Sequence, residues 1–194
     1  CGRSPLPEEE ADWLAPLSEE AKIKKALMAH ATAPLTPRQL QEAYQQVMAA
    51  REIRSNLQRM RSAGAEVHYC GLDIRDAEAL RQTLESLRPL CGPIRGVIHG
   101  AGVLADRRIE EKSAEQFASV YSTKVDGLFS LLEAVHVESL RFLALFSSST
   151  GRFGRTGQSD YAVANEILNK LAQQQATLRP DCRVGSLNGD PGDD

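Results

Sequence analysis

The chain has 194 residues, of which 42% are hydrophobic and 25% are charged, and its formal net charge is −3. A chain of this length can bury a core, and its mild charge excludes the basic surface expected of a nucleic-acid-binding protein. The sequence shows no apolar run that could cross a membrane and no signal peptide, so we expect a cytoplasmic protein that binds neither membranes nor nucleic acid.

The four cysteines are far apart in the sequence and include no C-x-x-C pair. This spacing gives no sign of a zinc site or of a disulfide framework. We therefore expect reduced thiols and no bound metal.

The first 64 residues are predicted to be largely helical. A short helix is expected over residues 18–31, capped by Ser18. Thr36 and Gln39 form the capping box of a second helix, and Gly64 is a helix stop. This second helix should have about 27 residues and a length of roughly 40 Å, which is long for a globular protein.

Four apolar segments after residue 64 are predicted to be strands, and helical segments separate them. The strands are expected at 65–73, 94–102, 141–149 and 182–188, and the helices at 76–90, at 113–135 and after Gly157. Apolar strands that alternate with helices indicate an α/β fold with a parallel sheet and helices on both of its faces.

Polar residues and glycines stand where these strands end. Asp73 ends the first strand, a Gly-Ala-Gly turn at 100–102 ends the second, and serines at 147–149 end the third. Ligands of an open parallel sheet bind outside the carboxyl ends of its strands. We therefore expect a site for a flat ligand at this edge of the sheet.

One lysine falls inside an apolar helical stripe. On the helix that starts at Ser113, Lys124 lies between Val120 and Leu128 in the spacing of the apolar face. An inward lysine is costly unless a site uses its charge, but its long side chain could equally reach past the stripe to water. The spacing alone leaves both interpretations open.

Tyr161 and Asn165 are four residues apart and so share one face of the next helix, which follows the strand that ends at Ser148. A hydroxyl, a phenol, an amide and a lysine could therefore meet at one place. The alternatives are a tyrosine that only packs and serines that only cap or turn the chain. The order of these features along the chain carries the inference.

Three stretches are similar to a known family: GPIRGVIHGAGVLAD (92–106), FASVYSTKVDGLFSLLEAV (117–135) and LALFSSSTGRFGRTGQSDYAVAN (143–165). They resemble the ketoreductase domain of type I polyketide synthases and polyunsaturated fatty acid synthases, within the short-chain dehydrogenase/reductase superfamily. The resemblance implies an oxidoreductase with a Rossmann-like, doubly wound parallel sheet and a long helical insertion near its N-terminus.

The resemblance also implies catalytic roles. Tyr161 would give a proton to a ketone oxygen, and Ser148 would hydrogen-bond that oxygen. Lys124 would favour the phenolate form of the tyrosine and hold the nicotinamide ribose. Most short-chain reductases have their lysine four residues after the tyrosine; here that position is Asn165, as in the family's ketoreductase domains. Asn165 would fix the geometry and a proton-relay water.

For the cofactor, the resemblance implies NADPH. Arg3 matches a residue that binds the 2′-phosphate, and Asp73 and Ile74 match residues that flank the adenine. The cofactor would also contact Lys124, Tyr161 and the turn formed by Gly100, Ala101 and Gly102.

Two positions bear on the stereochemistry of the product. Asp106 keeps the last aspartate of the Leu-Asp-Asp motif of the family's B-type domains. Phe153 stands where A-type domains have a tryptophan. Both favour the B-type product.

Two features of the family are missing. The first strand and its glycine-rich turn, T-G-x-x-G-x-x-G, should precede Arg3 and cradle the pyrophosphate. A Trp-Gly-Pro-Trp segment after the last strand is replaced by GDPGDD at 189–194. We therefore expect an N-terminally truncated fragment with an incomplete sheet. Residues 1–64 would hold the end of the first βα unit and the insertion, and residues 65–194 the core of one domain.

The expected function is that of a fragment of an NADPH-dependent β-ketoacyl reductase. It would reduce a β-keto acyl thioester on acyl carrier protein to the β-hydroxy form, beside the other domains of the same multienzyme. The alternative is a non-catalytic structural half that serves as a scaffold, although a scaffold has no need of the Ser, Tyr, Lys and Asn set. A serine hydrolase is disfavoured because the chain has no G-x-S-x-G elbow. The sequence leaves open whether the truncated chain itself is active.

Overall fold

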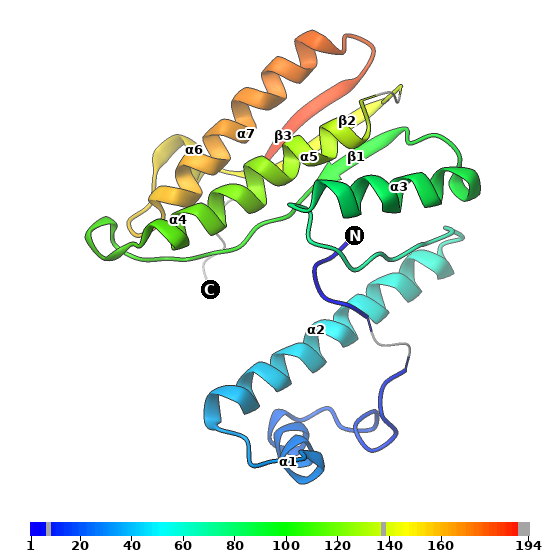
Figure 1. Ribbon diagram of the computed structural model, residues 1–194, viewed down its shortest axis with the longest axis vertical. Helices are drawn as coiled ribbons and strands as arrows, with labels where there is room; N and C mark the ends of the chain where they lie inside the picture. Colours follow the sequence, from blue (N-terminus) through cyan, green and yellow to red (C-terminus); the bar gives the residue numbers. More distant parts are fainter. Residues whose placement is uncertain (7–8, 137–138, 190–194) are drawn as a thin grey trace. The chain divides into compact units, whose positions relative to one another are not determined.

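The computed structural model describes residues 1–6, 9–136 and 139–189. The chain divides into two compact units, Cys1–Gly71 and Leu72–Asp194 (Figure 1). Most of the GDPGDD ending lies outside the described residues, which stop at Gly189. The grouping of residues 1–64 and 65–194 into one domain stays a prediction.

The N-terminal unit contains α1 (Glu20–His30) and α2 (Pro37–Ser62). The capping box of α2 is confirmed, because the Thr36 hydroxyl accepts the N–H of Gln39 and the Gln39 side chain accepts the N–H of Thr36. The cap predicted at Ser18 is wrong, since Glu19 is the N-cap of α1 and no side chain of the described residues caps this helix. Glu19 instead pairs with Lys22 one turn later, and such pairs stabilise a first helical turn.

The strand predicted at residues 65–73 is also wrong. Its place is taken by one parallel bridge between Gly2 and Gly71, where the N–H of Gly2 donates to the carbonyl of Cys70 over 3.0 Å. A strand needs a hydrogen-bonded neighbour along its length to satisfy its N–H and C=O groups. Among the described residues only Gly2 bridges to this segment, so the apolar pattern does not become a strand.

The second unit holds a parallel sheet of three strands in the order β1 (Gly96–His99), β2 (Phe142–Ser148) and β3 (Arg183–Gly189). The central strand β2 places Phe142 opposite Gly96 of β1 and opposite Arg183 of β3. The predicted α/β fold with a parallel sheet is confirmed. The carboxyl ends of the three strands meet at one edge, where the candidate site lies.

Helices join these strands in the predicted order. The long helix predicted from Ser113 begins with the expected capping box to Gln116, but a π-helical turn divides it. This turn and the short helix after β2 were not predicted. None of the helices in the described parts of the chain is long and apolar enough to cross a membrane. The helices of this unit are α3 (Ala77–Cys91), α4 (Ala114–Tyr121), α5 (Gly127–Ala134), α6 (Thr150–Phe153) and α7 (Ser159–Leu178), with a 3-10 turn η1 (Ile109–Glu111) and the π turn η2 (Ser122–Asp126).

The core of this unit lies on one face of the sheet, under the layer formed by α3, α5 and α7 (Figure 1). Leu143 and Leu145 of β2 are buried there against Leu128 of α5 and Leu168 of α7. On the opposite face, apolar side chains are 43–64% exposed: Ile98, Phe142, Phe146 and Leu187. The described residues of this unit therefore supply one of the two helical layers of a doubly wound fold.

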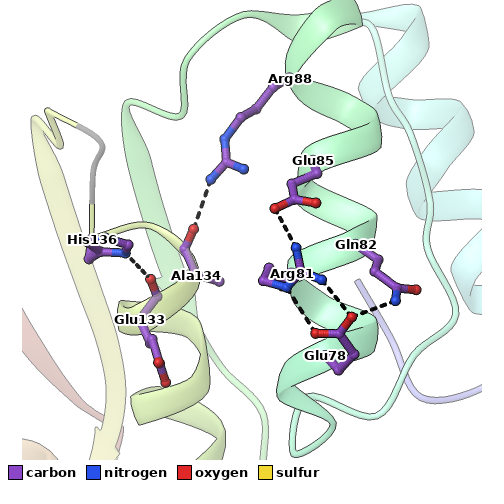
Figure 2. A network of polar contacts seen from close by, with 8 residues as sticks. All are labelled: Glu78, Arg81, Gln82, Glu85, Arg88, Glu133, Ala134 and His136. Carbon is purple, nitrogen blue, oxygen red and sulfur yellow. Dashed lines mark hydrogen bonds and ion pairs between the residues drawn. The ribbon is translucent and has the colours of Figure 1, made fainter.

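Figure 2 shows how α3 is attached to the end of α5. Arg88 donates to the carbonyl of Ala134 over 2.8 Å, and His136 Nδ1 donates to the carbonyl of Glu133 over 2.6 Å. Arg88 thus gives the carbonyl of Ala134 a donor at the helix end, and His136 adds a side-chain donor to the carbonyl of Glu133, which also accepts the N–H of His136. Along α3, Arg81 pairs with Glu78 and Glu85, and its hydrogen bond lowers the pKa of Glu78.

Candidate active site

Lys124 is buried at the centre of the candidate site. Its exposed fraction is 4%, and Nζ donates to the carbonyl of Phe146 near the end of β2 over 3.1 Å. The same nitrogen lies 5.2 Å from the centroid of the Tyr161 ring. Lys124 therefore points into the site and does not reach past the apolar stripe to water. Burial lowers the pKa of Lys124 because its charged form loses hydration.

The local backbone explains how a helix presents this lysine. Lys124 is the middle residue of η2, in which the N–H of Gly127 bonds to the carbonyl of Ser122. Such a turn holds one residue more than an α-helical turn, and π turns are frequent at functional sites. The strand ends on either side of Lys124 come from β1 and β2, whose register fixes them next to each other.

Tyr161 and Asn165 lie in the first two turns of α7, one turn apart. Asn165 is fully buried, and its Nδ2 donates to the carbonyl of Tyr161 over 2.8 Å. The carbonyl of Asn165 accepts from the Ser147 hydroxyl over 3.1 Å. Its side-chain oxygen, Oδ1, is buried and has no partner among the described residues. An amide oxygen in this state is free to accept a hydrogen bond from a water or a ligand.

The serines after β2 differ in their surroundings. Ser147 contributes to the wall of the cavity beside Lys124. Ser148 is 5% exposed; its hydroxyl accepts the N–H of Thr150 over 3.2 Å and donates to the carbonyl of Gly189 over 3.5 Å. Among the described residues, the Ser148 hydroxyl therefore bonds to the backbone of Thr150 and Gly189 and not to Tyr161. The catalytic role expected of Ser148 stays a prediction.

A cavity of about 440 Å³ opens between these residues and the glycine turn after β1. At Gly102 an added Cβ would lie 3.2 Å from Cε of Lys124, so any larger residue would crowd the lysine. Ala101, between the two glycines, is half-buried and does not line the cavity. Bare backbone on one side and an ammonium group on another suit a flat ligand with hydroxyl groups, such as a nicotinamide riboside. The lining consists of Gly100, Gly102, Val103, Leu104, Lys124, Phe146, Ser147 and Tyr161.

The residues expected to flank an adenine are not part of this lining. Arg75 donates to both carboxylate oxygens of Asp73 over 2.6–3.1 Å. Ile74 packs against Gly127, where an added Cβ would lie 2.7 Å from Ile74 Cγ2. Arg3 belongs to the N-terminal unit and is exposed there. The cofactor contacts of Arg3, Asp73 and Ile74 stay predictions.

The two positions connected with stereochemistry have different environments. The carboxylate of Asp106 accepts a hydrogen bond from Gln158 Nε2 over 2.8 Å. Phe153, at the end of α6, is 84% exposed. The Asp106–Gln158 contact ties the loop after β1 to the start of α7, beside Tyr161. Gln158 is not among the site residues expected from the sequence.

Sequence reasoning also missed a buried ion pair. Lys112 Nζ lies 2.7 Å from Asp160 Oδ2, and the two side chains are 3% and 1% exposed. Lys112 also donates to the carbonyl of Ala105 over 2.7 Å, and Asp160 Oδ1 accepts the N–H of Tyr161 over 2.9 Å. Lys112 follows two glutamates and precedes a helix cap, so its surroundings in the sequence resemble an exposed turn. The burial of Lys112 becomes visible only in the structure, where it pairs with Asp160, 48 residues away in the sequence.

Comparison with known proteins places the chain in a family. A family model described as the KR domain matches residues 17–187. The chain belongs to the ketoreductase (KR) domain family. The matched range starts in the N-terminal unit and ends in β3.

Individual relatives agree with this assignment. The KR domain is 37% identical over 179 residues to a polyunsaturated fatty acid synthase polypeptide from Thraustochytrium sp., and the match covers 88% of this chain and 6% of that protein. It matches the crystal structure of a ketoreductase domain from the bacillaene assembly line with a TM-score of 0.64 and 30% identity, over 86% of this chain and 40% of that one.

A more distant structure bears on the fold alone. A short-chain dehydrogenase from Mycobacterium avium matches with a TM-score of 0.65 and 19% identity, over 71% of this chain and 51% of that one. The Rossmann-like fold predicted from the sequence is thereby confirmed. The KR domain chain spans 6% of the length of its fatty acid synthase relative.

Proposed function

We propose that this KR domain is part of an NADPH-dependent β-ketoacyl reductase. The observation that carries the proposal is the position of the buried Lys124 ammonium, 5.2 Å from the centroid of the Tyr161 ring at the wall of one cavity. No carboxylate among the described residues pairs with Lys124, and a buried charge of this kind destabilises the fold unless a site uses it. Beside a phenol, that charge favours proton donation by the phenol.

Reduction of a ketone needs a hydride at the carbon and a proton at the oxygen. When bound, the nicotinamide cofactor supplies the hydride. Tyr161 donates its phenolic proton to the ketone oxygen, and the ammonium of Lys124 stabilises the phenolate that remains. The free side-chain oxygen of Asn165 holds a water on the route by which the proton returns.

A serine hydroxyl completes the site by donating to the same ketone oxygen. Its position in the family motif assigns this role to Ser148, thirteen residues before Tyr161. Ser147 lines the cavity but donates to the carbonyl of Asn165. We assign Ser147 to holding α7 and Ser148 to the ketone, which requires the Ser148 hydroxyl to turn from Gly189 when substrate binds. Removing one donor of this kind lowers kcat by about 10²–10³-fold.

The proposed cofactor contacts extend beyond the cavity. Gly100, Ala101 and Gly102 would lie beside the nicotinamide half, and Asp73 and Ile74 beside the adenine. The guanidinium of Arg3 would bind the 2′-phosphate, which distinguishes NADPH from NADH. These assignments follow the family motif.

The proposed substrate is a β-keto acyl thioester on acyl carrier protein. Its support is the similarity to a fatty acid synthase and to a domain from an assembly line. Within such a multienzyme the KR domain would work with the other domains of the same protein, in the cytoplasm. Asp106, held by Gln158, would favour the B-type product.

The experiment uses the full-length protein that contains this chain and follows NADPH oxidation with a β-ketoacyl thioester. Tyr161→Phe should lower kcat by about 10²–10⁴-fold because the proton donor is lost. Tyr121→Phe is the matched control: Tyr121 stacks on Phe117 within α4, and its loss should leave kcat unchanged. Full activity of Tyr161→Phe would refute the mechanism. A full-length protein that binds no NADPH would instead support the scaffold alternative.

A further inference from the structure

His99 is a fully buried histidine that the mechanism above does not use. It ends β1, its exposed fraction is 1%, and its Nε2 lies 2.8 Å from the carbonyl oxygen of Lys124. A carbonyl can only accept a hydrogen bond, so Nε2 carries the proton and donates it. In the neutral ring Nδ1 is then an acceptor, and it is buried without a partner among the described residues.

An imidazole is an expensive choice for this position. A buried acceptor without a hydrogen bond destabilises the fold, whereas an apolar side chain of similar size would fill the space without that cost. Burial also lowers the pKa of His99, so the ring stays neutral at pH 7. What the ring adds over an apolar residue is the N–H that it donates to Lys124.

That hydrogen bond acts on the backbone of the catalytic lysine. Lys124 is the middle residue of the π turn η2, and its ammonium is held separately by the carbonyl of Phe146. The neighbouring strands β1 and β2 thus hold Lys124 at two points: His99 of β1 bonds its backbone carbonyl, and Phe146 of β2 bonds its ammonium group. In an ordinary α-helix each residue turns by about 100°, so loss of the extra residue of η2 would swing the Lys124 side chain away from Tyr161.

We propose that His99 is a positioning residue that holds the π turn in register and so keeps the ammonium of Lys124 beside Tyr161. The proposed effect on catalysis rests on the function proposed above. The proposed effect on geometry does not, and it can be measured without any turnover. His99→Leu removes the N–H at nearly constant volume, and His99→Gln keeps an N–H at the position of Nε2.

The test measures how fast single lysines are acetylated by a pulse of acetic anhydride, read by mass spectrometry on the full-length protein. Lys124 is 4% exposed as a whole residue, and the side chain of Lys112 is 3% exposed, so both are buried. The side chain of Lys170, in contrast, is 62% exposed. In His99→Leu, acetylation of Lys124 should rise by about tenfold relative to Lys112, since one hydrogen bond is lost locally. In His99→Gln it should stay near the wild-type value, and Lys170 should react alike in all three proteins.

Two results would overturn the proposal. One is an acetylation rate of Lys124 that is the same in His99→Leu as in the wild-type protein. The other is an equal rise in the acetylation rates of Lys112 and Lys124, which would show that the imidazole only stabilises the fold.

If His99→Leu does not fold, His99→Asn takes its place, because its amide ends one bond earlier and cannot reach the carbonyl. Where the wild-type protein reduces a β-ketoacyl thioester, kcat should be lower in His99→Leu, the variant in which Lys124 is acetylated faster. In His99→Gln, kcat should return to near the wild-type value. A wild-type protein without activity refutes the proposed function and leaves the acetylation result to decide on His99.

Discussion

At Lys124 the requirements of stability and of function oppose each other. The ammonium is buried beside one carbonyl and one aromatic ring, and no carboxylate among the described residues pairs with it. Its pKa is lowered by burial, so folding weakens its hold on the proton. The same burial places a positive charge next to the phenol that the proposed reaction needs. Residues with this conflict are typical of active sites.

Lys124→Met should therefore stabilise the protein while it removes activity. Because the folded pKa lies below the unfolded value of 10.5, the charged lysine opposes folding at neutral pH and ceases to do so as the pH rises to that value. The variant should melt higher at pH 7, by about 2–4 °C for each kcal/mol that burial of the charge costs, and this difference should shrink towards pH 10.5. Thermal unfolding followed by circular dichroism at several pH values measures it.

The control for this prediction is Lys170→Met, on the exposed surface of α7. Lys170 pairs with Glu166 at 3.2 Å and is largely exposed, so its replacement should change the melting temperature little at any pH. A Lys124→Met protein that melts at a lower temperature than the wild-type protein at pH 7 would contradict the prediction. It would show that the contacts of the ammonium stabilise the fold by more than its loss of hydration destabilises it.

At the scale of elements, caps were predictable from sequence and long-range partners were not. The boxes at Thr36 and Ser113 involve residues three apart, so the sequence contains both partners. The strand at 65–73 failed because a strand depends on a distant neighbour, and among the described residues only Gly2 bridges to it. The direction of Lys124 could not be decided, because the π turn shifts the helical register by one residue.

The loop between β1 and α4 is joined to the start of α7 by three contacts. The N–H of Arg107 donates to the carbonyl of Gly157 over 3.0 Å, Gln158 donates to Asp106, and Lys112 pairs with Asp160. The last of these is buried, so removing one of its partners should cost more than breaking either of the other two contacts. It also lies next to Tyr161, whose N–H donates to Asp160.

Removing one partner of this pair should destabilise the protein strongly. Lys112→Met and Asp160→Asn each leave a buried charge without its counter-ion, and each should lower the free energy of unfolding by about 3–5 kcal/mol. The double variant leaves neither charge and should recover most of that loss. Urea unfolding of the wild-type protein, the two single variants and the double variant gives the four free energies of this double-mutant cycle. Additive losses in the double variant would mean that the pair is not coupled.

At the scale of the whole chain, the family model spans residues 17–187 and so includes parts of both compact units. Within the second unit, the sheet is covered by helices on one face only among the described residues. Parallel sheets are ordinarily buried on both faces. Four large apolar side chains of the other face are instead 43–64% exposed: Ile98, Phe142, Phe146 and Leu187.

This face should give the 194-residue chain a high affinity for dyes that bind apolar surface. Replacing Phe142 and Leu187 by serine should reduce the fluorescence of bound 8-anilinonaphthalene-1-sulfonate by about half, because two of the four exposed apolar side chains of this face are removed. Leu178→Ser is the control, since Leu178 is 65% exposed but lies at the end of α7. Equal dye binding in all variants would show that this face is covered in solution.

The most direct test of the central claim follows a labelled hydride in the full-length protein. NADPH that carries deuterium at the transferred position is mixed with a β-ketoacyl thioester, and the β-hydroxy product is analysed by mass spectrometry. We expect one deuterium at the β-carbon with the wild-type protein, and a rate about 10²–10⁴-fold lower with Tyr161→Phe or Lys124→Met. Product without deuterium, or wild-type rates in both variants, would contradict it.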